Sequence, residues 1–246
     1  MAHPSMTPLG PEKTIYREET GFDENLKIDI KFAEMELIAV LKESEVSRIF
    51  HVNYFGKPRV LKVFHNNEDL GYARDGLRDL NRTRCEIRAY CNLKLFKICD
   101  GGFVPKFYGY MIAINPTSWA PHLDAFQQDI NPPSAILIEY LPNPLPMNSD
   151  TYTKERFEKV NIGIRQIHSS LIEHNDPYPK NVLIVPGDPE RVVWIDFDVA
   201  IVYPNETYIG KNESRYIEFE TRGVESYGTM LEKDQMEGLP PNSKYY

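Results

Sequence analysis

Five short runs of β-branched and aromatic residues, separated by polar breaks, lie within the first 141 residues of the chain. Such runs are typical of β-strands, because branched and aromatic side chains pack well on a pleated surface. They cover residues 35–41, 46–54, 58–64, 106–114 and 135–141. Residues 53–57 (NYFGK) supply a tight turn between the second and third runs. We therefore predict a five-stranded antiparallel sheet that begins as a meander.

Two longer stretches, residues 77–96 and 153–172, place apolar residues at helical spacing. The apolar positions are Leu80, Cys85, Ile87, Tyr90, Cys91 and Leu95 in the first stretch, and Phe157, Val160, Ile164, Ile167, Leu171 and Ile172 in the second. A closing helix is expected at 214–236, interrupted near Gly223 and Gly228. Together with the sheet, these helices predict an α+β fold.

Proline-rich segments separate these elements. Four prolines lie between residues 114 and 135, where we expect a surface excursion and not a domain linker. Residues 141–146 (LPNPLP) can neither continue a sheet nor start a long helix, because proline lacks the N–H donor, so they predict a connector. Short strands are expected at 181–185 and 192–195, on either side of a PGDP turn.

The first 28 residues are polar, contain three prolines and show no sustained period. We expect a mobile, disordered tail at residues 1–28, followed by a single domain at 29–246. With 246 residues, of which 41% are hydrophobic and 26% charged, the chain has ordinary globular composition.

Charge and hydropathy exclude several classes of function. A formal net charge of −8 argues against a general nucleic-acid binder, since such proteins rely on Lys and Arg. No apolar run approaches the roughly 18 residues that a membrane span requires. The N-terminus lacks the hydrophobic region of a signal peptide, so a cytoplasmic or nuclear location, not secretion, is expected. A monomer is expected.

The cysteines point to a reducing compartment. Cys85, Cys91 and Cys99 are odd in number and form no C-x-x-C pair. We interpret them as buried or half-buried thiols.

A group of polar residues follows the second predicted helix. His174, Asn175 and Asp176 come directly after it, Asn181 follows five residues after Asp176, and Asp196 ends the last predicted strand. Taken singly, each has an ordinary explanation: an Asp-Pro turn, a local cap, or the end of a strand. Their joint order and the strand-turn-strand between them favour a functional site.

This stretch resembles the H-R-D-x-x-x-x-N catalytic loop and the D-F-G metal motif of protein kinases. The resemblance covers roughly residues 31–200. It implies a two-lobed fold in which the sheet and one helix form an N-terminal lobe (29–141), residues 139–146 form a hinge, and 147–246 form a minimal helical C-terminal lobe. It also implies that the chain holds ATP and Mg²⁺.

The resemblance assigns roles to individual residues. Asp176 would orient the attacking hydroxyl, while Asn181 and Asp196 would supply the oxygen ligands that Mg²⁺ prefers. His174 matches a position that packs beneath the metal loop, so we do not expect it to be catalytic.

Further residues of the resemblance lie in the sheet and its helix. Residues 60–63 (VLKV) resemble the V-A-I-K strand, so Lys62 would contact the α- and β-phosphates and pair with Glu86. The alternatives are a lysine on the solvent face of a strand and a surface ion pair for Glu86, which has arginines at 82, 84 and 88. The backbone of Glu139 and Leu141 would bond the adenine edge, with Ile138 beside them.

The chain also departs from the family pattern. Residues 42–45 (KESE) stand where a glycine-rich loop would cover the phosphates, and they contain no glycine. Asn175, Tyr178 and Asp198 replace residues typical of protein kinases. Only 48 residues follow Asp198, with no A-P-E sequence for a peptide-docking platform. The Asp-Phe-Asp form and the missing A-P-E also resemble choline and aminoglycoside phosphotransferases.

Three hypotheses therefore remain open. The first is an ATP- and Mg²⁺-dependent phosphotransferase that transfers the γ-phosphate to a hydroxyl of an unidentified protein or small molecule. The second is a weak or inactive pseudokinase that binds nucleotide or a partner protein. The third is a small-molecule kinase of the choline and aminoglycoside type, which a deep acidic pocket beside Asp176 would support.

Overall fold

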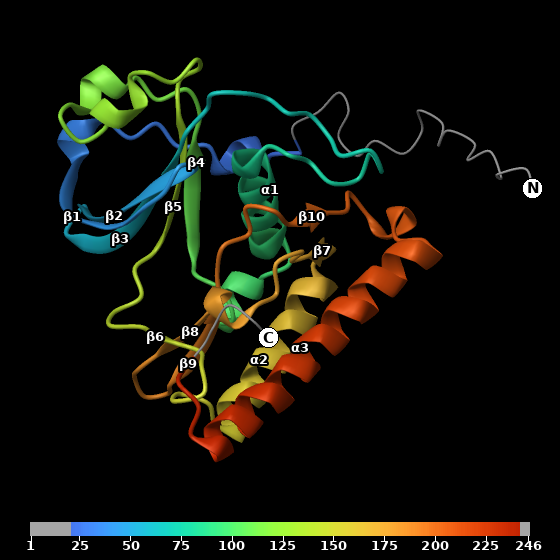
Figure 1. Cartoon of the computed structure of the whole chain (residues 1–246). Coiled ribbons are helices and arrows are strands. Elements are labelled where there is room, and N and C mark those ends of the chain that lie inside the picture. Colours follow the sequence, from blue (N-terminus) through green and yellow to red (C-terminus); the bar gives the residue numbers. More distant parts are fainter. Residues whose placement is uncertain (1–20, 242–246) are drawn as a thin grey trace, which may run out of the picture.

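A five-stranded antiparallel sheet forms the upper part of the molecule in Figure 1. The computed structural model describes residues 21–241. The strands are β1 (Met35–Glu43), β2 (Ser47–Tyr54), β3 (Lys57–Phe64), β4 (Phe107–Met111) and β5 (Ser134–Glu139), and their spatial order is β1-β2-β3-β5-β4. The predicted sheet and the α+β class are confirmed.

The two faces of this sheet are covered by different segments. In β3, Val60 and Phe64 belong to the hydrophobic core that includes helix α1 (Arg82–Leu95). Lys62 lies between them, two residues from each, and therefore on the same face of the sheet. Leu61 and Val63 belong to a second core on the opposite face. The proline-rich excursion between β4 and β5 covers that face with Trp119, Leu123 and Phe126. It is therefore a packed cover of the sheet.

Helix α1 is shorter than the predicted helix at 77–96. It begins at Arg82, because the side chain of Asn81 accepts a hydrogen bond from the backbone N–H of Arg84 and caps the helix. Leu95, the last apolar position of the predicted helix, is 72% exposed. Leu93 is buried in its place.

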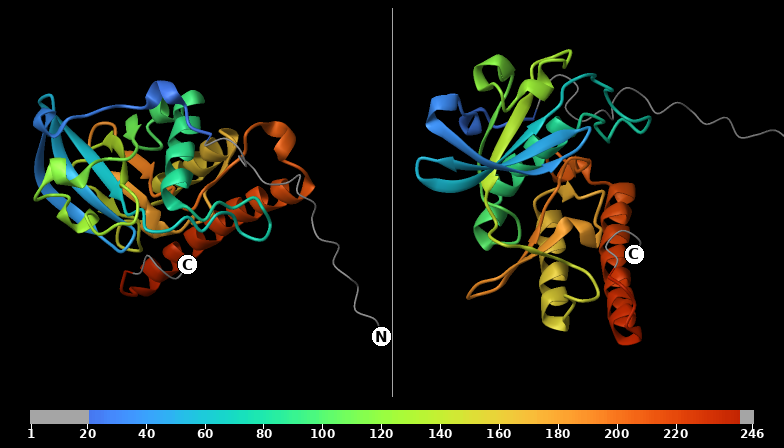
Figure 2. Two further views of the ribbon diagram at one scale, coloured as in Figure 1. Left: turned by 90° about the horizontal axis from the view of Figure 1, so that it is seen from above. Right: turned by 60° about the vertical axis from the view of Figure 1, so that its left-hand side comes forward.

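Helices α2 (Lys154–Ser169) and α3 (Lys211–Glu237) lie side by side below the sheet (Figures 1 and 2). The predicted breaks in the closing helix are wrong, since α3 is continuous from Lys211 to Glu237. Gly228 is needed at a close approach, because a Cβ atom there would collide with the ring of Phe157 in α2. Gly223 faces open space.

Two small sheets complete the lower part. The first joins β6 (Leu145–Pro146), β8 (Val182–Val185) and β9 (Arg191–Trp194), in the order β6-β8-β9. The predicted connector at 141–146 thus ends as a short edge strand, a position where proline is tolerated. The second pairs β7 (Ile172–Glu173) with β10 (Ile201–Val202). Ile172 therefore belongs to a strand and not to helix α2, which ends at Ser169.

Short 3-10 turns link the larger elements. They are η2 (Glu24–Leu26), η3 (Phe32–Glu34), η4 (Ile98–Gly101), η5 (Pro116–Trp119), η6 (Asp124–Phe126), η7 (Pro179–Asn181) and η8 (Glu206–Tyr208).

Part of the predicted tail at 1–28 is packed on the sheet. Residues 1–20 lie outside the described residues, but Leu26 contacts Gly109 of β4 closely, and the N–H of Ile28 donates to the carbonyl of Tyr110 over 2.9 Å. The predicted boundary at residue 28 is therefore too late. None of the helices within residues 21–241 has both the length and the apolar character to cross a membrane. The three cysteines are free and buried, as predicted.

Candidate active site

A cavity of about 300 Å³ lies where the sheet meets α1, the connector and β8. Its walls are largely apolar, with Val60 from β3, Ile138 from β5 and Leu183 from β8. Lys62, Glu86 and Asp196 supply charge at one side. An apolar cavity with a few convergent polar groups is the usual form of a small-molecule site.

Lys62 lies between two carboxylates. Its Nζ atom is 2.6 Å from Oε2 of Glu86 and 2.7 Å from Oδ1 of Asp196. The predicted pairing of Lys62 with Glu86 is confirmed. Lys62 is only 5% exposed, so the alternative of a lysine on the solvent face is wrong.

The surface ion pair considered for Glu86 is also wrong, because this residue is buried in α1. Two of the neighbouring arginines are engaged elsewhere. Arg84 binds Asp79 through Nε at 2.8 Å, and Arg82 binds Asp198 through Nη1 at 2.8 Å. Lys62 is therefore the cation that pairs with Glu86.

Electrostatics at this triad favour a charged lysine. Burial opposes the ammonium form, but the carboxylates of Glu86 and Asp196 outweigh it and raise the pKa of Lys62. Burial also opposes the ionised form of Asp196, yet Lys62 holds the pKa of this carboxyl below its usual range. Complete burial raises the pKa of Glu86, although Lys62 acts against it. Asp196 is therefore the more readily ionised of the two carboxyls.

The predicted catalytic residue Asp176 is held by its own loop. Nδ2 of Asn181 donates to both the carbonyl and Oδ2 of Asp176, each at 2.8 Å. Nζ of Lys180 lies 2.8 Å from the same Oδ2 atom. Lys180 was missed by the sequence analysis, although its spacing of four residues from Asp176 is a visible signal.

Strand pairing brings the two predicted metal ligands together. Val182 of β8 is opposite Trp194 of β9, and the N–H of Ile195 donates to the carbonyl of Asn181 over 2.9 Å. Asn181 therefore lies beside the residue that precedes Asp196. One amide oxygen and one carboxylate suit Mg²⁺, which binds few protein ligands when phosphates complete its shell. Within residues 21–241, no cluster of three or more His, Cys, Asp or Glu side chains could hold a metal alone.

Glu220 of α3 holds the start of the loop at residues 174–181. Its buried carboxylate accepts hydrogen bonds from the backbone N–H of His174 at 2.9 Å and of Asn175 at 2.6 Å. Nε2 of His168 lies 2.6 Å from the same carboxylate. Burial opposes ionisation, but the hydrogen bond from His168 is the first of several contacts that hold the pKa of Glu220 below its usual range. Sequence analysis missed this residue, because it lies 45 positions from the loop.

The site also contains backbone conformations that are costly for side-chain-bearing residues. Asn175 has φ 62° and Asp196 has φ 66°. Each costs on the order of 1–2 kcal/mol and persists only where surrounding contacts offset that cost, and such residues cluster at functional sites. The contacts to Glu220 and Lys62 impose these two.

Aromatic rings connect the sheet to the loop at residues 174–181. Tyr90 of α1 stacks on Phe107 of β4 with centroids 5.2 Å apart, and meets Phe197 edge-on at 5.5 Å. Phe197 in turn packs on His174 at 4.8 Å. His174 is fully buried against the rings of Phe197 and Trp194, so it occupies a packing position in the core.

The predicted hinge forms one wall of the cavity. The N–H of Glu139 donates to the carbonyl of Lys106 over 2.9 Å, and its carboxylate binds Arg191 at 2.7 Å. Burial opposes ionisation of Glu139, but Arg191 outweighs it and lowers its pKa. These contacts fix the end of β5, and Leu141 follows as a buried residue of the same wall.

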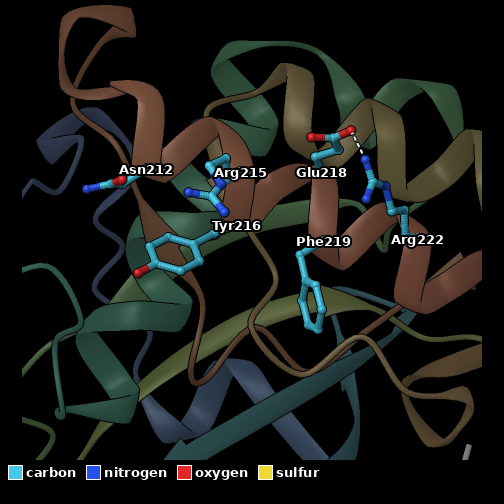
Figure 3. A pocket seen from close by; sticks show the side chains of 6 residues that line it. All are labelled: Asn212, Arg215, Tyr216, Glu218, Phe219 and Arg222. Carbon is cyan, nitrogen blue, oxygen red and sulfur yellow. Dashed lines mark hydrogen bonds and ion pairs between the residues drawn. The ribbon is translucent and has the colours of Figure 1, made fainter.

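A larger hollow, of about 500 Å³, lies on the outer surface of α3. All six residues that line it come from α3 and none lines the cavity described above. Figure 3 shows the rings of Tyr216 and Phe219 and the ion pair between Glu218 and Arg222. It lacks a convergence of charges like that around Lys62, so we place the candidate active site in the smaller cavity.

The sequence matches no protein-family model and no curated protein. A function for this chain therefore has to be argued from the residues of the cavity and the loops around it.

Proposed function

We propose that this chain is an ATP- and Mg²⁺-dependent phosphotransferase with a two-lobed, protein-kinase-like fold. The observation that carries the proposal is the position of the Lys62 ammonium, between Glu86 and Asp196 at the side of an apolar cavity. Three buried or half-buried charges from β3, α1 and the segment after β9 would not converge there for stability alone, because burying ion pairs contributes little to it.

The cavity suits a nucleotide. Its apolar side, with Val60, Ile138 and Leu183, would take the adenine ring, and the backbone of Glu139 and Leu141 would bind the polar edge of the base. Lys62 would then contact the phosphates at the charged side. In this proposal residues 29–141 form the N-terminal lobe, 139–146 the hinge and 147–246 the C-terminal lobe.

Asn181 and Asp196 are the residues that would hold Mg²⁺. When bound, the ion would neutralise charge on the phosphates. The chain itself would keep Asp196 ionised through Lys62 and would keep the amide of Asn181 oriented through its hydrogen bonds to Asp176.

Asp176 would serve as the group that accepts the proton of the acceptor hydroxyl. As that oxygen forms a bond to the γ-phosphorus, the bond between the γ-phosphorus and the bridging oxygen breaks and ADP leaves. Lys180 would place a positive charge beside Asp176 during this step. The acceptor is either a protein or a small molecule.

Two observations favour a second candidate, a nucleotide-binding pseudokinase. Oδ2 of Asp176 is already occupied by Asn181 and Lys180, and the loop at 42–45 has no glycine. Small-molecule kinase activity has less support, since neither the 300 Å³ cavity nor the α3 hollow includes Asp176.

Thermal unfolding with and without Mg·ATP tests the proposal. Ligand at 100 times its dissociation constant adds about 2.7 kcal/mol, which corresponds to roughly 5–10 °C in Tm for a chain of this size. Asp196→Asn should abolish the part of this shift that depends on Mg²⁺ and leave the fold intact. Asp188→Asn, in the exposed turn between β8 and β9, is the matched control.

A parent protein with no shift would overturn nucleotide binding. A shift that persists in Asp196→Asn would overturn the metal role. Binding without any ATP hydrolysis or transfer would favour the pseudokinase over the enzyme.

A further inference from the structure

Three backbone N–H groups of the turn between β1 and β2, those of Ser44, Val46 and Ser47, already donate hydrogen bonds within the turn. The hydroxyl of Ser44 lies 3.3 Å from the N–H of Val46 and 3.1 Å from that of Ser47, and accepts from both. The N–H of Ser44 donates to the carbonyl of Ser47 over 3.0 Å. A glycine-rich loop would offer such groups to a ligand, so another residue has to supply the attraction here.

A bulge in β1 turns Lys42 toward the cavity. Val40 is opposite Phe50, but Lys42 is opposite Ile49, so Leu41 is the extra residue. Bulges re-aim the side chains that follow them. Without this one, Leu41 would be opposite Ile49, and Lys42 would be displaced to the other face of the sheet.

The bulge places Lys42 in the same cross-strand row as Lys62. Ile49 is opposite Lys42 on one side and opposite Lys62 on the other, and residues directly opposite each other share a face of the sheet. The two lysines are two strand spacings apart, roughly 10 Å at the backbone. Ammonium groups at the ends of long side chains with this separation can reach different phosphates of one nucleotide.

Lys42 borders two adjoining cavities. It lines the 300 Å³ cavity and also a more polar one of about 210 Å³, whose other charged residues are Lys62, Arg82, Asp196 and Asp198. Within the described part of the chain, those other cations bind carboxylates, whereas Lys42 makes no ion pair. Burial opposes ionisation of Asp196, but Lys62 and, to a smaller extent, Lys42 lower the pKa of this carboxyl.

The two glutamates that follow Lys42 in the 42–45 loop lie outside both cavities. Glu43 forms an ion pair with Nε of Arg48 at 3.4 Å, and its side chain is 57% exposed. Neither Glu43 nor Glu45 lines either cavity. The loop therefore presents a positive charge to the cavities, although three of its four residues at 42–45 are acidic or neutral.

We propose that Lys42 is a second phosphate-binding lysine, which takes over the part that loop amides play in a glycine-rich loop. The inference rests on the proposed function, since it assigns the phosphate chain of the nucleotide to the space between Lys42 and Lys62. The attraction of Lys42 then depends on the number of phosphates, so it favours ATP over ADP and has no effect on adenosine.

Calorimetric titration of the whole chain with ATP, ADP and adenosine, in the presence of Mg²⁺, tests the inference. Lys42→Met removes the charge and keeps the apolar stem. It should weaken ATP binding about tenfold, the usual order for one charged hydrogen bond, weaken ADP binding less, and leave adenosine unchanged. Lys42→Arg should restore most of the ATP affinity. Lys57→Met, at the exposed start of β3, is the control and should change nothing.

Each outcome decides between the possibilities. If the parent binds ATP and Lys42→Met binds it equally well, the inference is wrong and the proposed function stands. Equal losses for ATP and adenosine would also overturn it, since Lys42 would then act through the base or the fold. If the parent binds none of the three ligands, both the inference and the proposed function fail.

Discussion

The ammonium of Lys180 lies 2.8 Å from Oδ2 of Asp176, four residues earlier in the chain. Lys180 is about half exposed, whereas the Asp176 side chain is more protected. The lysine is thus held at the loop of residues 174–181 by the residue that would receive the acceptor's proton in the proposed reaction. In that reaction its charge would stabilise the phosphoryl group in transfer.

Substitutions at these two positions should affect turnover but not ATP binding. Asp176→Ala should lower the rate of phosphotransfer or slow ATP hydrolysis by roughly 10²–10⁴-fold, the usual contribution of a positioned acid–base group. Lys180→Met should lower it by roughly 10–100-fold, since one electrostatic contact is lost. Steady-state kinetics and calorimetric ATP titration measure the two effects separately.

Circular dichroism controls for folding, because Asp176 precedes Pro177 in a tight turn. Unchanged turnover in a folded Asp176→Ala protein would rule out the proposed role of this residue. If neither the parent nor the variants show activity, the pseudokinase is the better description.

Lys62 and Glu86 should show strong energetic coupling. Lys62→Met leaves Glu86 buried without its partner and should lower the free energy of unfolding by about 3–5 kcal/mol. The double variant Lys62→Met/Glu86→Leu should recover most of that loss, because two apolar side chains replace the pair. Neither variant should bind Mg·ATP. Urea unfolding and calorimetry check these statements.

Additive losses in the double variant would show that the pair is not coupled. Full Mg·ATP binding by the double variant would remove Lys62 from the proposed site, whatever its stability.

Glu173 should make the protein less stable as the pH rises toward neutrality. Its carboxylate accepts a hydrogen bond from Tyr203 at 3.0 Å, but burial, with a smaller effect from Glu220, raises its pKa to about 7. Between its ordinary pKa near 4.5 and about 7, the folded state binds more protons than the unfolded state. Its stabilising contribution is therefore complete below pH 4.5 and lost as the pH passes 7.

Urea unfolding at pH 5 and pH 7.5 measures this effect. Glu173→Gln cannot ionise, so its stability should fall less than that of the parent between the two values. Glu86, whose pKa burial raises to about 8, contributes with the same sign in both proteins and cancels in the comparison. Glu206→Gln, at an exposed position, should follow the parent. A Glu173→Gln protein that also follows the parent would show that Glu173 is ionised throughout this range.

The two glycines of α3 should respond in opposite directions to alanine. Gly223→Ala should raise the free energy of unfolding by about 0.5–1 kcal/mol, because the position is open and alanine favours the helix. Gly228→Ala should lower it by about 1–3 kcal/mol, because the new methyl group collides with Phe157. Thermal or urea unfolding measures both variants. Equal changes in the free energy of unfolding for the two would contradict the packing of α3 on α2.

Local patterns predicted much of the fold and part of the site. The apolar stripe of α2 is confirmed because Phe157, Val160 and Ile164 recur at the period of one buried helix face. The pairing of Lys62 with Glu86 was predicted because the motif places them on consecutive elements. The start of α1 was predicted five residues early, since the cap at Asn81 depends on its local backbone.

The remaining features depend on contacts that no local pattern contains. Glu220 was missed because its partners His174 and Asn175 lie in a distant loop. Lys42 was placed in the loop at 42–45 and given no role, because a bulge that shifts one residue changes the face to which a side chain belongs. Arg82 was considered only as a neighbour of Glu86, whereas the fold directs it to Asp198.

The dependence of the loop at residues 174–181 on Glu220 has a consequence for synthesis of the chain. The loop leaves the ribosome well before α3, and until residues 211–237 follow, the N–H groups of His174 and Asn175 lack their carboxylate. The sheet and α1 can fold by then, but the loop cannot yet hold its strained backbone. We therefore expect the loop to reach its final conformation in the nascent chain only after α3 has docked, and under the proposed function phosphotransfer would begin only then.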